Sequence, residues 1–571
     1  MAVKDYELWL EKACDDKDLR PELLSIQGVD GEIADRFAVE LEFGTAGLRG
    51  VIGAGTNRMN VYMIRKATQG LATYLLNNAK KPIAVAISYD SRNKSTDFAR
   101  AAAAVLAAND ITAHIYKELM PVPALSFATR YLHCAAGIMV TASHNPAKYN
   151  GYKAYGADGC QMTSEAADTV YAEMQKLDVF SDVKTMSFDE GVECGKIKYI
   201  ENDVIEALYD NIKAQSVRKD LCKTAGLKLV YSPLNGSGNV PVRRVLKDIG
   251  VTDITVVPEQ ELPDGNFPTC SYPNPEIRET LSLGLALAQK ISADLMIATD
   301  PDADRVGIAV RDDKGEYELL SGNEVGVLLL DYLCKARIEN GTMPKNPIMV
   351  KSIVSTCLAD AVANSYGVEA VNVLTGFKYI GEQIHLLEEK GEAERFIFGF
   401  EESYGYLSGT YVRDKDAVVA SMLICEMAAY YKSIGTSVLK ALDAIYAKFG
   451  RWLHKVDSFT FEGLSGMDKM RDIMTALRTN PLTAIGGQAV VKRADYDTHE
   501  MLDIANEKMS KIDLPAANVL TFWLKDGSNV IVRPSGTEPK IKVYYSTSGK
   551  TLAQAEAKRA LLSADIQPLL K

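Results

Sequence analysis

Residues 135–145 read AAGIMVTASHN, and this stretch decides what kind of fold the chain forms. An uninterrupted apolar run ends abruptly in a polar segment that begins at Thr141. Fully apolar runs of this length are typical of strands that are buried on both faces of a parallel sheet. In such sheets, ligands bind at loops that follow the carboxyl ends of the strands. Residues 141–145 therefore form a candidate functional loop.

The same order of elements occurs three times along the chain. In the first segment, IAVAIS (83–88), the helical stretch DFARAAAAVLAAND (97–110) and ITAHIY (111–116) precede that loop. The second segment contains LKLVYS (227–232), VPVRRVLKDIG (240–250), DITVV (253–257) and ADLMIATDPDADR (293–305). The third contains NPIMVKS (346–352), CLADAVANSYG (357–367), AVNVL (370–374) and RFIFGFEESYG (395–405). Short buried strands that alternate with helices predict three related α/β domains, each offering one polar loop to a common site.

The remainder of the chain, from about residue 455, follows a different order. TFWL (521–524), the turn DGSN (526–529) and VIVR (530–533) indicate a β-hairpin, and a last helix is expected from about residue 551. This part predicts a separate α+β domain. We therefore expect four domains, with boundaries at 1–215, 216–320, 321–450 and 451–571.

Composition restricts the class of protein. The chain has 571 residues with a net charge of −11, which argues against a nucleic-acid partner because binding to phosphate backbones requires a basic face. We expect no signal peptide and no membrane span, since charged residues interrupt every long apolar run. Nine scattered cysteines without a CxxC pair predict buried free thiols in a reducing compartment. These features indicate a cytoplasmic protein.

The loop ATDPDADR carries Asp300, Asp302 and Asp304 at alternating positions directly after a strand. Three carboxylates this close together repel one another unless a cation binds among them, and oxygen ligands suit Mg²⁺, Mn²⁺ or Ca²⁺. An EF-hand is excluded because Arg305 and Arg311 stand where that loop requires Gly and Glu. The alternative is a solvated turn with capping aspartates. The position at a strand end favours the metal site.

The loop VRPSGTEPK gathers two cations, two hydroxyl groups and a glycine after a strand: Arg533, Ser535, Gly536, Thr537 and Lys540. This combination suits a phosphate group, although a basic hairpin turn has the same composition. A nucleotide-binding P-loop is not supported, because GxxxxGK[ST] does not occur in the sequence.

Other candidate residues lie in GFEESYGY, where Glu401 and Ser403 suit sugar hydroxyls, although the residues alone favour a helix N-cap. Basic candidates are Lys378, Arg413 and Lys415, together with Arg49 in the glycine-rich segment FGTAGLRG.

Ser143 follows its strand directly, and Asn150-Gly151 marks a second turn. A serine hydroxyl is a weak nucleophile without a base or a metal, and most serines in turns only form local hydrogen bonds. The G-x-S-x-G sequence of serine hydrolases is absent here. The residues alone leave the chemistry of Ser143 open.

Taken together, these loops resemble the α-D-phosphohexomutase superfamily over nearly the whole chain. TASHNPAKYNGYK resembles its phosphoserine loop, DPDADR its metal loop, GFEESYGY its sugar-selecting loop and RPSGTEPK its phosphate loop. They occur in the family's order, and FGTAGLRG and TGFKYIG point to the longer branch that includes phosphoglucomutases and phosphopentomutases. The resemblance implies four domains around a central cleft.

The resemblance also implies roles for individual residues. Ser143 matches the serine that carries the phosphoryl group, and Asp300, Asp302 and Asp304 match the ligands of one Mg²⁺ per chain, with a phosphoryl oxygen on Ser143 completing the set. His144, Lys153 and Lys415 match basic catalytic residues, and the two lysines are candidate general bases. Arg49, also assigned to catalysis, and Arg305 match groups that support the serine and metal loops. The residues matching a sugar-phosphate site are Lys378, Glu401, Ser403, Arg413, Arg305, Arg533, Ser535, Gly536, Thr537 and Lys540.

The implied activity is the interconversion of glucose 1-phosphate and glucose 6-phosphate, with glucose 1,6-bisphosphate as activator, by a cytoplasmic monomer or weak dimer. Alternatives are the same chemistry on pentose or mannose phosphates, a metal-dependent phosphatase, and a non-catalytic sugar-phosphate sensor. The loop EESYG lacks the histidine that mutases acting on both glucose and mannose phosphates often carry, which lowers the expected mannose activity.

Overall fold

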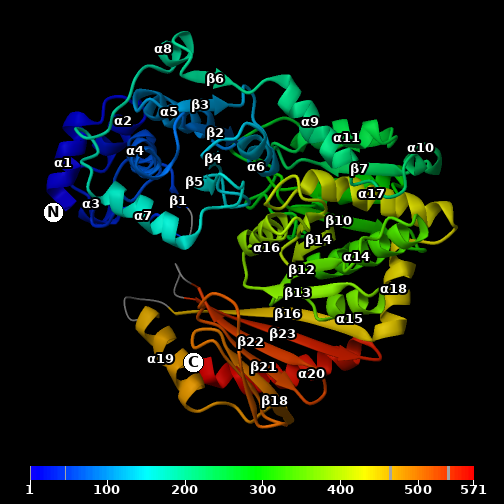
Figure 1. The fold of residues 1–571 in the computed structure, drawn as a ribbon. Helices are drawn as coiled ribbons and strands as arrows, with labels where there is room; N and C mark the ends of the chain where they lie inside the picture. Colours follow the sequence, from blue (N-terminus) through cyan, green and yellow to red (C-terminus); the bar gives the residue numbers. More distant parts are fainter. Residues whose placement is uncertain (1, 45–46, 462–465, 536–539, 571) are drawn as a thin grey trace. The chain divides into compact units, whose positions relative to one another are not determined.

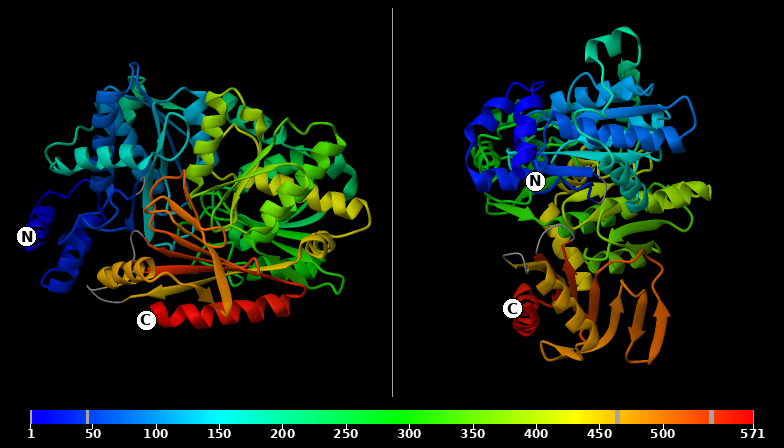
Figure 2. Two further views of the ribbon diagram at one scale, coloured as in Figure 1. Left: turned by 60° about the horizontal axis from the view of Figure 1, so that its bottom comes forward. Right: turned by 90° about the vertical axis from the view of Figure 1, so that its left-hand side faces the viewer.

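A computed structural model describes residues 2–44, 47–461, 466–535 and 540–570. The chain divides into two compact units, which are described separately. The first unit contains Met1–Gly322, Ile380–Gly399 and Ser403–Gly435, and the second contains Asn323–Tyr379, Phe400–Glu402 and Thr436–Lys571. Figure 1 shows the elements along the chain, and Figure 2 gives two further views.

The first sheet has six strands in the order β1-β5-β4-β2-β3-β6. Its strands are β1 (Gly47–Val51), β2 (Ala84–Tyr89), β3 (Thr112–Ile115), β4 (Ala136–Val140), β5 (Tyr149–Gly156) and β6 (Ile197–Tyr199). Its helices are α1 (Ala2–Lys12), α2 (Leu19–Ser25), α3 (Asp30–Phe37), α4 (Val61–Asn78), α5 (Ser95–Ala108), α6 (Val122–Tyr131), α7 (Ser164–Gln175), α8 (Phe188–Glu193) and α9 (Asn202–Lys213). Every residue of β4 is buried, as expected for a central strand covered by helices on both faces.

The second sheet has the order β11-β10-β9-β7-β8. Its strands are β7 (Lys228–Ser232), β8 (Asp253–Val256), β9 (Leu295–Thr299), β10 (Val306–Arg311) and β11 (Tyr317–Leu320). Its helices are α10 (Leu221–Ala225), α11 (Asn239–Asp248), α12 (Pro258–Glu261) and α13 (Ser282–Ile291). Strands β8, β7 and β9 pair in parallel, and only the edge formed by β10 and β11 is antiparallel. The first sheet has the same pattern, with β1 and β5 at its antiparallel edge and β6 paired in parallel with β3.

The third sheet has the order β13-β12-β14-β15, and β12 pairs in parallel with β13. Its strands are β12 (Ile348–Ser352), β13 (Glu369–Val373), β14 (Phe396–Glu401) and β15 (Gly405–Leu407). Its helices are α14 (Gly322–Glu339), α15 (Leu358–Ser365), α16 (Phe377–Glu389), the 3₁₀ turn η1 (Ala393–Arg395), α17 (Ala417–Ser433) and α18 (Val438–Phe449). The three related α/β segments predicted from the sequence are therefore confirmed as mixed sheets.

The C-terminal part forms a larger sheet in the order β16-β23-β22-β21-β18-β19-β20, with β17 paired to β18. Its strands are β16 (Arg451–Thr460), β17 (Ala484–Ile485), β18 (Gln488–Asp495), β19 (Glu500–Asp503), β20 (Lys508–Lys511), β21 (Leu520–Leu524), β22 (Asn529–Pro534) and β23 (Lys540–Gly549). Its helices are α19 (Gly466–Thr479), α20 (Leu552–Ile566) and the 3₁₀ turn η2 (Gln567–Leu570). The predicted hairpin is confirmed, because β21 and β22 pair antiparallel.

At β22 and β23 both faces of the C-terminal sheet pack against other elements, whereas β20 is exposed. Val532, Val543 and Tyr545 belong to a core with residues of α19 and α20, which lie against one face of the sheet. The alternate residues Ile531 and Tyr544 point to the other face. There they form a second apolar cluster with residues that follow β12 and β13, among them Val354. The C-terminal domain thus packs against part of the third domain within the second unit.

The prediction of free thiols is confirmed in the described residues, whereas the prediction that they are buried holds for only some of the cysteines. All nine cysteines are free; five are buried, while Cys14 and Cys194 are exposed. No single helix in the described ranges is long and apolar enough to cross a membrane, and α17 and α18 meet that test only as a pair bent by 88°.

His454 in β16 leads to a prediction about pH. Burial and the nearby Lys351 ammonium lower the pKa of His454 from 6.5 to about 3. Unfolded chains therefore bind a proton at His454 below pH 6.5 that the folded protein does not, so this one residue contributes a fall in stability of about 1.4 kcal/mol per pH unit as the pH decreases. We expect His454→Gln to reduce the difference between the free energies of unfolding in urea at about pH 7.5 and about pH 5.5 by about 1.4 kcal/mol, the share that His454 contributes.

The exposed His133 supplies the control for that comparison. His133→Asn should keep the wild-type difference between the two pH values. An unchanged difference in His454→Gln would contradict the assignment of this slope to His454.

Candidate active site

The loops that follow β4, β9 and β14 share an unusual backbone feature. Each contains one residue other than glycine in the left-handed region: Ser143 (φ 52°), Ala303 (φ 47°) and Tyr404 (φ 66°). This conformation is costly and persists where surrounding contacts enforce it, often at functional sites. In the first two loops the chain reverses into an antiparallel strand, β5 after β4 and β10 after β9. The repeated pattern seen in the sequence is thus also repeated in backbone geometry.

The strand β5 corrects one prediction. Asn150-Gly151 was expected to form a second turn, but both residues lie inside β5. Gly151 is required there because a Cβ atom would lie 2.5 Å from the carbonyl oxygen of Thr141. The Asn150 side chain donates to the carbonyl oxygen of Asn93, and its own carbonyl accepts from the Gly151 amide. The Asn-Gly pair is typical of turns, but here it lies in a strand in which the Asn150 side chain bonds to neighbouring backbone groups.

Ser143 is 3% exposed and lies against the first carboxylate of the metal loop. Its Oγ donates to Asp300 Oδ2 at 2.9 Å and lies 3.2 Å from His144 Nδ1. Burial and the charges of Arg305, Arg49 and Arg92 lower the pKa of His144 to about 2, although Asp302 opposes this. The imidazole is therefore neutral near pH 7 and can exchange a hydrogen bond with the serine hydroxyl.

The three aspartates predicted to bind a metal lie together and are fully shielded from solvent. Their exposed fractions are 0%, 0% and 2%, and oxygens of all three lie within 4.8 Å of one another. The alternative of a solvated turn is therefore wrong. Within the described residues this is the one such group of possible metal ligands.

The donor set of this group fits a small divalent cation. Asp302 Oδ1 and Asp304 Oδ1 are buried and accept no hydrogen bond from any described residue. Burial and the charges of Asp302 and Asp304 raise the pKa of Asp300, whereas the ammonium groups of Lys153 and Lys415 lower that of Asp302 despite its burial. Carboxylate oxygens in a compact cluster are the ligands that Mg²⁺ prefers, so Asp300, Asp302 and Asp304 would hold it.

Two lysines from different domains meet at these carboxylates. Lys153 in β5 donates to Asp302 Oδ2 at 3.0 Å, and its Nζ lies 3.9 Å from Asp304. Lys415 lies 3.2 Å from Asp304 and also contacts Asp414, which accepts a hydrogen bond from Tyr155. The structure therefore brings both candidate general bases to one cluster.

Position 405 must be glycine for this arrangement. A Cβ on Gly405 would lie 2.0 Å from the Lys415 Cδ atom. Lys415 thus occupies the space that a side chain at position 405 would fill.

Two arginines flank the same cluster. Arg305 donates to Glu276 at 2.7 Å, and its Nε lies 3.6 Å from Asp304. Arg49 is exposed in β1, and its charge acts on Asp302, Asp304 and Arg305. Because Arg49 pairs with Gly151, it points to the same face of the sheet as Lys153. Basic side chains are therefore concentrated around the carboxylate cluster, although the chain as a whole has a negative net charge.

The first unit also contains the predicted substrate ligands Arg413 and Ser403. Arg413 is 0% exposed, and its guanidinium bonds the carbonyls of Thr410 and Val412 and pairs with Glu388. Ser403 is partly exposed in the turn after β14. No helix begins in this turn, so the N-cap explanation of Glu401 and Ser403 is wrong. Substrate binding by Ser403 and Arg413 stays a prediction.

The second unit brings a predicted sugar ligand close to a predicted phosphate ligand. Glu401 Oε1 accepts a hydrogen bond from the Gly376 amide at 2.7 Å. Burial, together with the charges of Glu402 and Glu401, raises the pKa of Tyr544 to about 12 against the opposing effect of Arg533. The Tyr544 phenol is therefore within electrostatic range of both Glu401 and Arg533.

Arg533 and Lys540 lie on one face of the C-terminal sheet. Arg533 pairs with Lys542, which is two residues from Lys540 and so shares its face. The Ser535 amide donates to the Lys540 carbonyl at 2.7 Å across the loop. Lys378 lies in α16 with its ammonium 5.1 Å from the ring centre of Tyr379. Gly536 and Thr537 lie outside the described residues.

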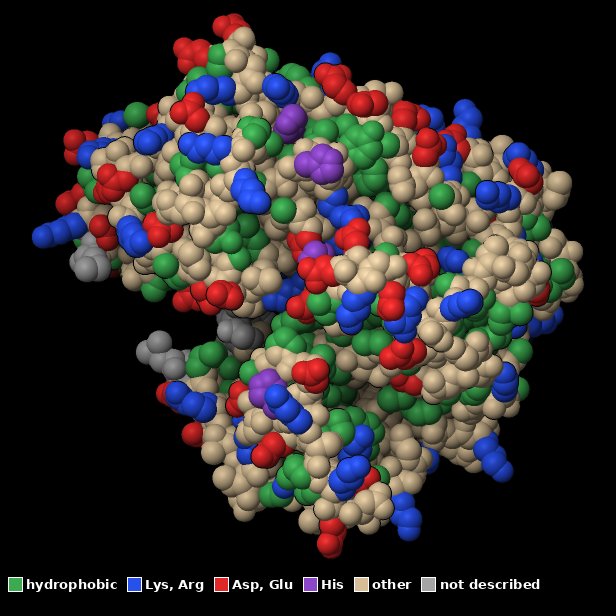
Figure 3. Space-filling view, in the orientation of Figure 1, with side chains coloured by type: hydrophobic (Ala, Val, Ile, Leu, Met, Phe, Trp, Pro, Cys, Tyr) green, Lys and Arg blue, Asp and Glu red, His purple; other side chains and the backbone are tan. Residues whose placement is uncertain are grey.

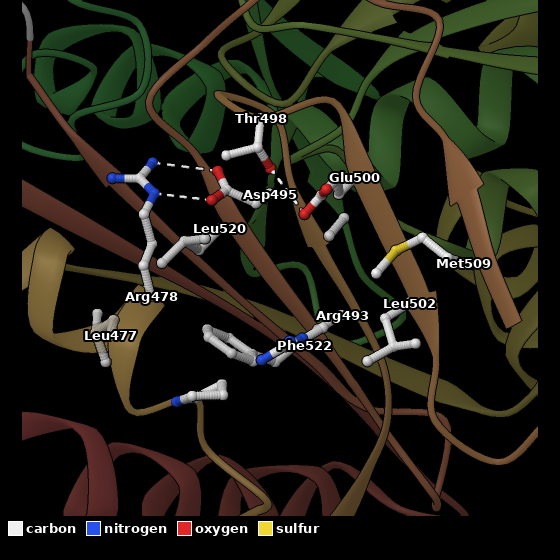
Figure 4. A pocket seen from close by; sticks show the side chains of 12 residues that line it. Leu477, Arg478, Arg493, Asp495, Thr498, Glu500, Leu502, Met509, Leu520 and Phe522 are labelled. Carbon is white, nitrogen blue, oxygen red and sulfur yellow. Dashed lines mark hydrogen bonds and ion pairs between the residues drawn. The ribbon is translucent and has the colours of Figure 1, made fainter. Parts of the chain in front are cut away.

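A separate pocket of about 220 Å³ lies in the C-terminal domain, between α19 and the strands β18 to β21. Leu477, Leu520 and Phe522 form apolar walls, and Arg478 pairs with Asp495 at its rim, as Figure 4 shows. It contains none of the predicted site residues.

On the surface shown in Figure 3, acidic and basic side chains are interspersed.

Sequence reasoning missed several residues that position the site. Asp90, Arg92, Glu276 and Asp414 contact the loops or the lysines described above, and Thr141, inside the predicted loop, had no role assigned to it. A signal was present for two of them, because YDSRN (89–93) follows the apolar strand IAVAIS just as the recognised loops follow theirs.

Comparison with known families matches each part of the chain in order. The models for phosphoglucomutase/phosphomannomutase α/β/α domains I, II and III match residues 40–179, 205–315 and 321–449, and the C-terminal domain model matches residues 489–561. A phosphoglucomutase from Staphylococcus aureus is 38% identical over 548 residues, covering 96% of both chains. One from Staphylococcus epidermidis is 38% identical and covers 89% of this chain and 91% of its own.

Solved structures show the same fold. A putative phosphomannomutase from Thermus thermophilus aligns with a TM-score of 0.67 at 23% identity, covering 93% of this chain and 99% of its own. The open form of the Paramecium phosphoglucomutase parafusin aligns with a TM-score of 0.66 at 19% identity, covering 93% and 95%. With all four domains matched in order, the chain belongs to the phosphoglucomutase/phosphomannomutase family of the α-D-phosphohexomutase superfamily.

Proposed function

We propose that this chain is a phosphoglucomutase, an isomerase that interconverts α-D-glucose 1-phosphate and glucose 6-phosphate through a phosphoserine at Ser143. The observation that carries the proposal is the hydrogen bond from Ser143 to Asp300 inside a buried carboxylate cluster that two lysines contact. The relatives that share 38% of their residues with this chain are named phosphoglucomutases.

The reaction requires a phosphoryl group to leave Ser143 and later to return. The phosphorus–oxygen bond to Ser143 Oγ breaks while a bond forms to a hydroxyl oxygen of the sugar monophosphate. A bound Mg²⁺ would neutralise charge that develops on the transferring group. The resulting glucose 1,6-bisphosphate then returns its other phosphoryl group to Ser143.

Protons move with each transfer. We assign Lys153 and Lys415 as candidates to accept the proton of the attacking sugar hydroxyl, because their Nζ atoms already lie at the carboxylate cluster. The lysine that accepts this proton does so as the neutral amine and becomes the ammonium ion. The neutral His144 can hydrogen-bond the Ser143 oxygen as the phosphoryl group leaves. Arg49 and Arg305 add positive charge beside the serine and metal loops.

In the second unit, we assign Glu401 to the sugar hydroxyls and Arg533, Ser535 and Lys540 to the phosphate that does not react. Lys378, Ser403, Arg413, Gly536 and Thr537 stay assigned to substrate binding on the resemblance. We also propose one Mg²⁺ per chain, glucose 1,6-bisphosphate as activator, and a cytoplasmic monomer or weak dimer.

A direct test compares kcat/KM for glucose 1-phosphate, mannose 1-phosphate and ribose 1-phosphate. The proposal expects the highest value for glucose 1-phosphate. A higher value for either of the other sugars would contradict it, and so would release of inorganic phosphate faster than isomerisation.

Truncation of the phosphate ligands should affect binding more than chemistry. We expect Arg533→Ala or Lys540→Ala to raise KM by about 10-fold to 100-fold with a smaller fall in kcat, because a contact with the unreactive phosphate stabilises substrate and transition state alike. Steady-state kinetics measure both constants. The exposed Lys511 in β20 supplies the control, since Lys511→Ala should leave KM unchanged. A loss confined to kcat would contradict the assignment.

A further inference from the structure

Arg92, which has no role in the assignments above, binds the backbone of the loop that contains Ser143. It lies just after β2 with 3% of its surface exposed. One terminal nitrogen donates to the carbonyls of Pro146 and Tyr149 at 3.0 and 3.1 Å. The other donates to the carbonyls of Ser143 and Asn145, both at 2.5 Å. One guanidinium group thus binds four carbonyls within residues 143–149.

The guanidinium is held from its other sides as well. Its Nε lies 3.4 Å from Asp90 Oδ2, while Asp90 Oδ1 accepts from the Arg92 amide and from Ser95 Oγ. The Phe267 ring, from the second domain, lies with its centre 5.1 Å from Arg92 Cζ. Only arginine offers a planar group with several donors in fixed directions, so its orientation determines where the four carbonyls lie.

Thr141 provides a second connection between Asp90, the partner of Arg92, and Ser143. Its Oγ1 accepts a hydrogen bond from the Ser143 amide at 2.8 Å. The same hydroxyl lies 2.6 Å from Asp90 Oδ2 and 3.2 Å from Asp302 Oδ2. Asp90 and Thr141 therefore link the backbone of Ser143 to one of the three carboxylates of the metal loop.

We infer that Arg92, held by Asp90, is a positioning residue that maintains Ser143 in the geometry required for phosphoryl transfer. Ser143 has a left-handed backbone that its own sequence does not favour, so outside contacts must enforce it. The four carbonyls bound by Arg92 begin at Ser143 itself and continue to the start of β5. In the described residues, no hydrogen bond joins Arg92 to the Ser143 hydroxyl or to the carboxylates of Asp300, Asp302 and Asp304, so Arg92 acts through the loop.

The inference rests on the proposed function, and it adds that Arg92 positions Ser143 rather than only stabilising the fold. If Arg92 only stabilised the fold, its replacement would lower the melting temperature while the folded fraction kept the wild-type rate. If it positions Ser143, the folded variant transfers phosphoryl groups slowly, because a small misplacement of a reacting atom costs about 100-fold in rate.

The test uses Arg92→Lys and Arg92→Gln in the full chain, with Arg100→Gln as control. Arg100 is exposed on α5 of the same domain and lies near Phe188. The measurements are the rate of label transfer to Ser143 from radiolabelled glucose 1,6-bisphosphate, kcat and KM for glucose 1-phosphate, and the melting temperature. Lysine keeps the charge, but one ammonium group cannot span the four carbonyls.

We expect both Arg92 variants to slow labelling and kcat by about 100-fold, with KM changed by less than about threefold. Arg100→Gln should behave as wild type. A folded Arg92 variant that labels at the wild-type rate would overturn the inference, and full rescue by lysine would show that only the charge matters and would overturn it too.

Thr141 provides a second test if the Arg92 variants do not fold. Thr141→Val removes the hydroxyl with little change in volume and should slow labelling, while Thr141→Ser should retain the wild-type rate. Equal rates in valine and serine variants would contradict the network. Absence of labelling in the wild-type protein would refute the proposed function rather than this inference.

Discussion

Replacing Ser143 with alanine is expected to abolish transfer of label from glucose 1,6-bisphosphate to the protein and to lower kcat by about 10⁴-fold or more. The reason is that the hydroxyl is the only atom of this residue that can carry a phosphoryl group, and it already lies 2.9 Å from Asp300. Removing one buried oxygen leaves the surrounding carboxylates and lysines in place. The measurement is the stoichiometry of labelling in parallel with the rate of isomerisation.

The exposed Ser181, in the same domain, supplies the control. Ser181→Ala should incorporate one phosphoryl group and retain wild-type activity. Stoichiometric labelling of Ser143→Ala would show that another residue is the nucleophile, and the assignment of Ser143 would then be wrong.

The second large effect is expected for Asp302→Asn. This side chain is fully buried, and its Oδ1 atom accepts no hydrogen bond from the described residues. The amide removes one negative charge from the cluster, so affinity for Mg²⁺ should fall by at least about 100-fold and kcat by about 10³-fold, or about 4 kcal/mol in activation free energy. Equilibrium dialysis of the metal gives the affinity independently of activity.

Asp313→Asn is the matched control, because Asp313 is an exposed carboxylate that follows β10 in the same domain. It should bind Mg²⁺ as tightly as the wild type. Wild-type metal affinity in Asp302→Asn would contradict the placement of the metal among these carboxylates.

The metal cluster could be predicted from the sequence because its three aspartates lie within five residues, directly after a fully apolar strand. The threefold alternation of strands and helices predicted that this loop and the Ser143 loop occupy equivalent strand ends. The structure confirms this in the contact of Ser143 with Asp300, although 157 positions separate them. The domain boundaries at 215, 320 and 450 and the roles of the individual residues stay predictions.

Other parts of the site could not be predicted, for identifiable physical reasons. Asn150-Gly151 has the composition of a turn, yet pairing with β1 makes it part of a strand, and pairing between distant segments leaves no local signal. Arg92 acts through backbone carbonyls, which every residue possesses, so no pattern of side chains marks its partners. Arg413 resembles a substrate ligand in sequence, but its buried guanidinium pairs with the exposed carboxylate of Glu388.

The most direct test of the central claim is the intact mass of the purified protein before and after incubation with Mg²⁺ and glucose 1,6-bisphosphate. We predict that unphosphorylated chains gain the mass of one phosphoryl group and that fragmentation locates it on Ser143. No gain in mass, or a phosphoryl group on another residue in a preparation that isomerises glucose 1-phosphate, would contradict the account.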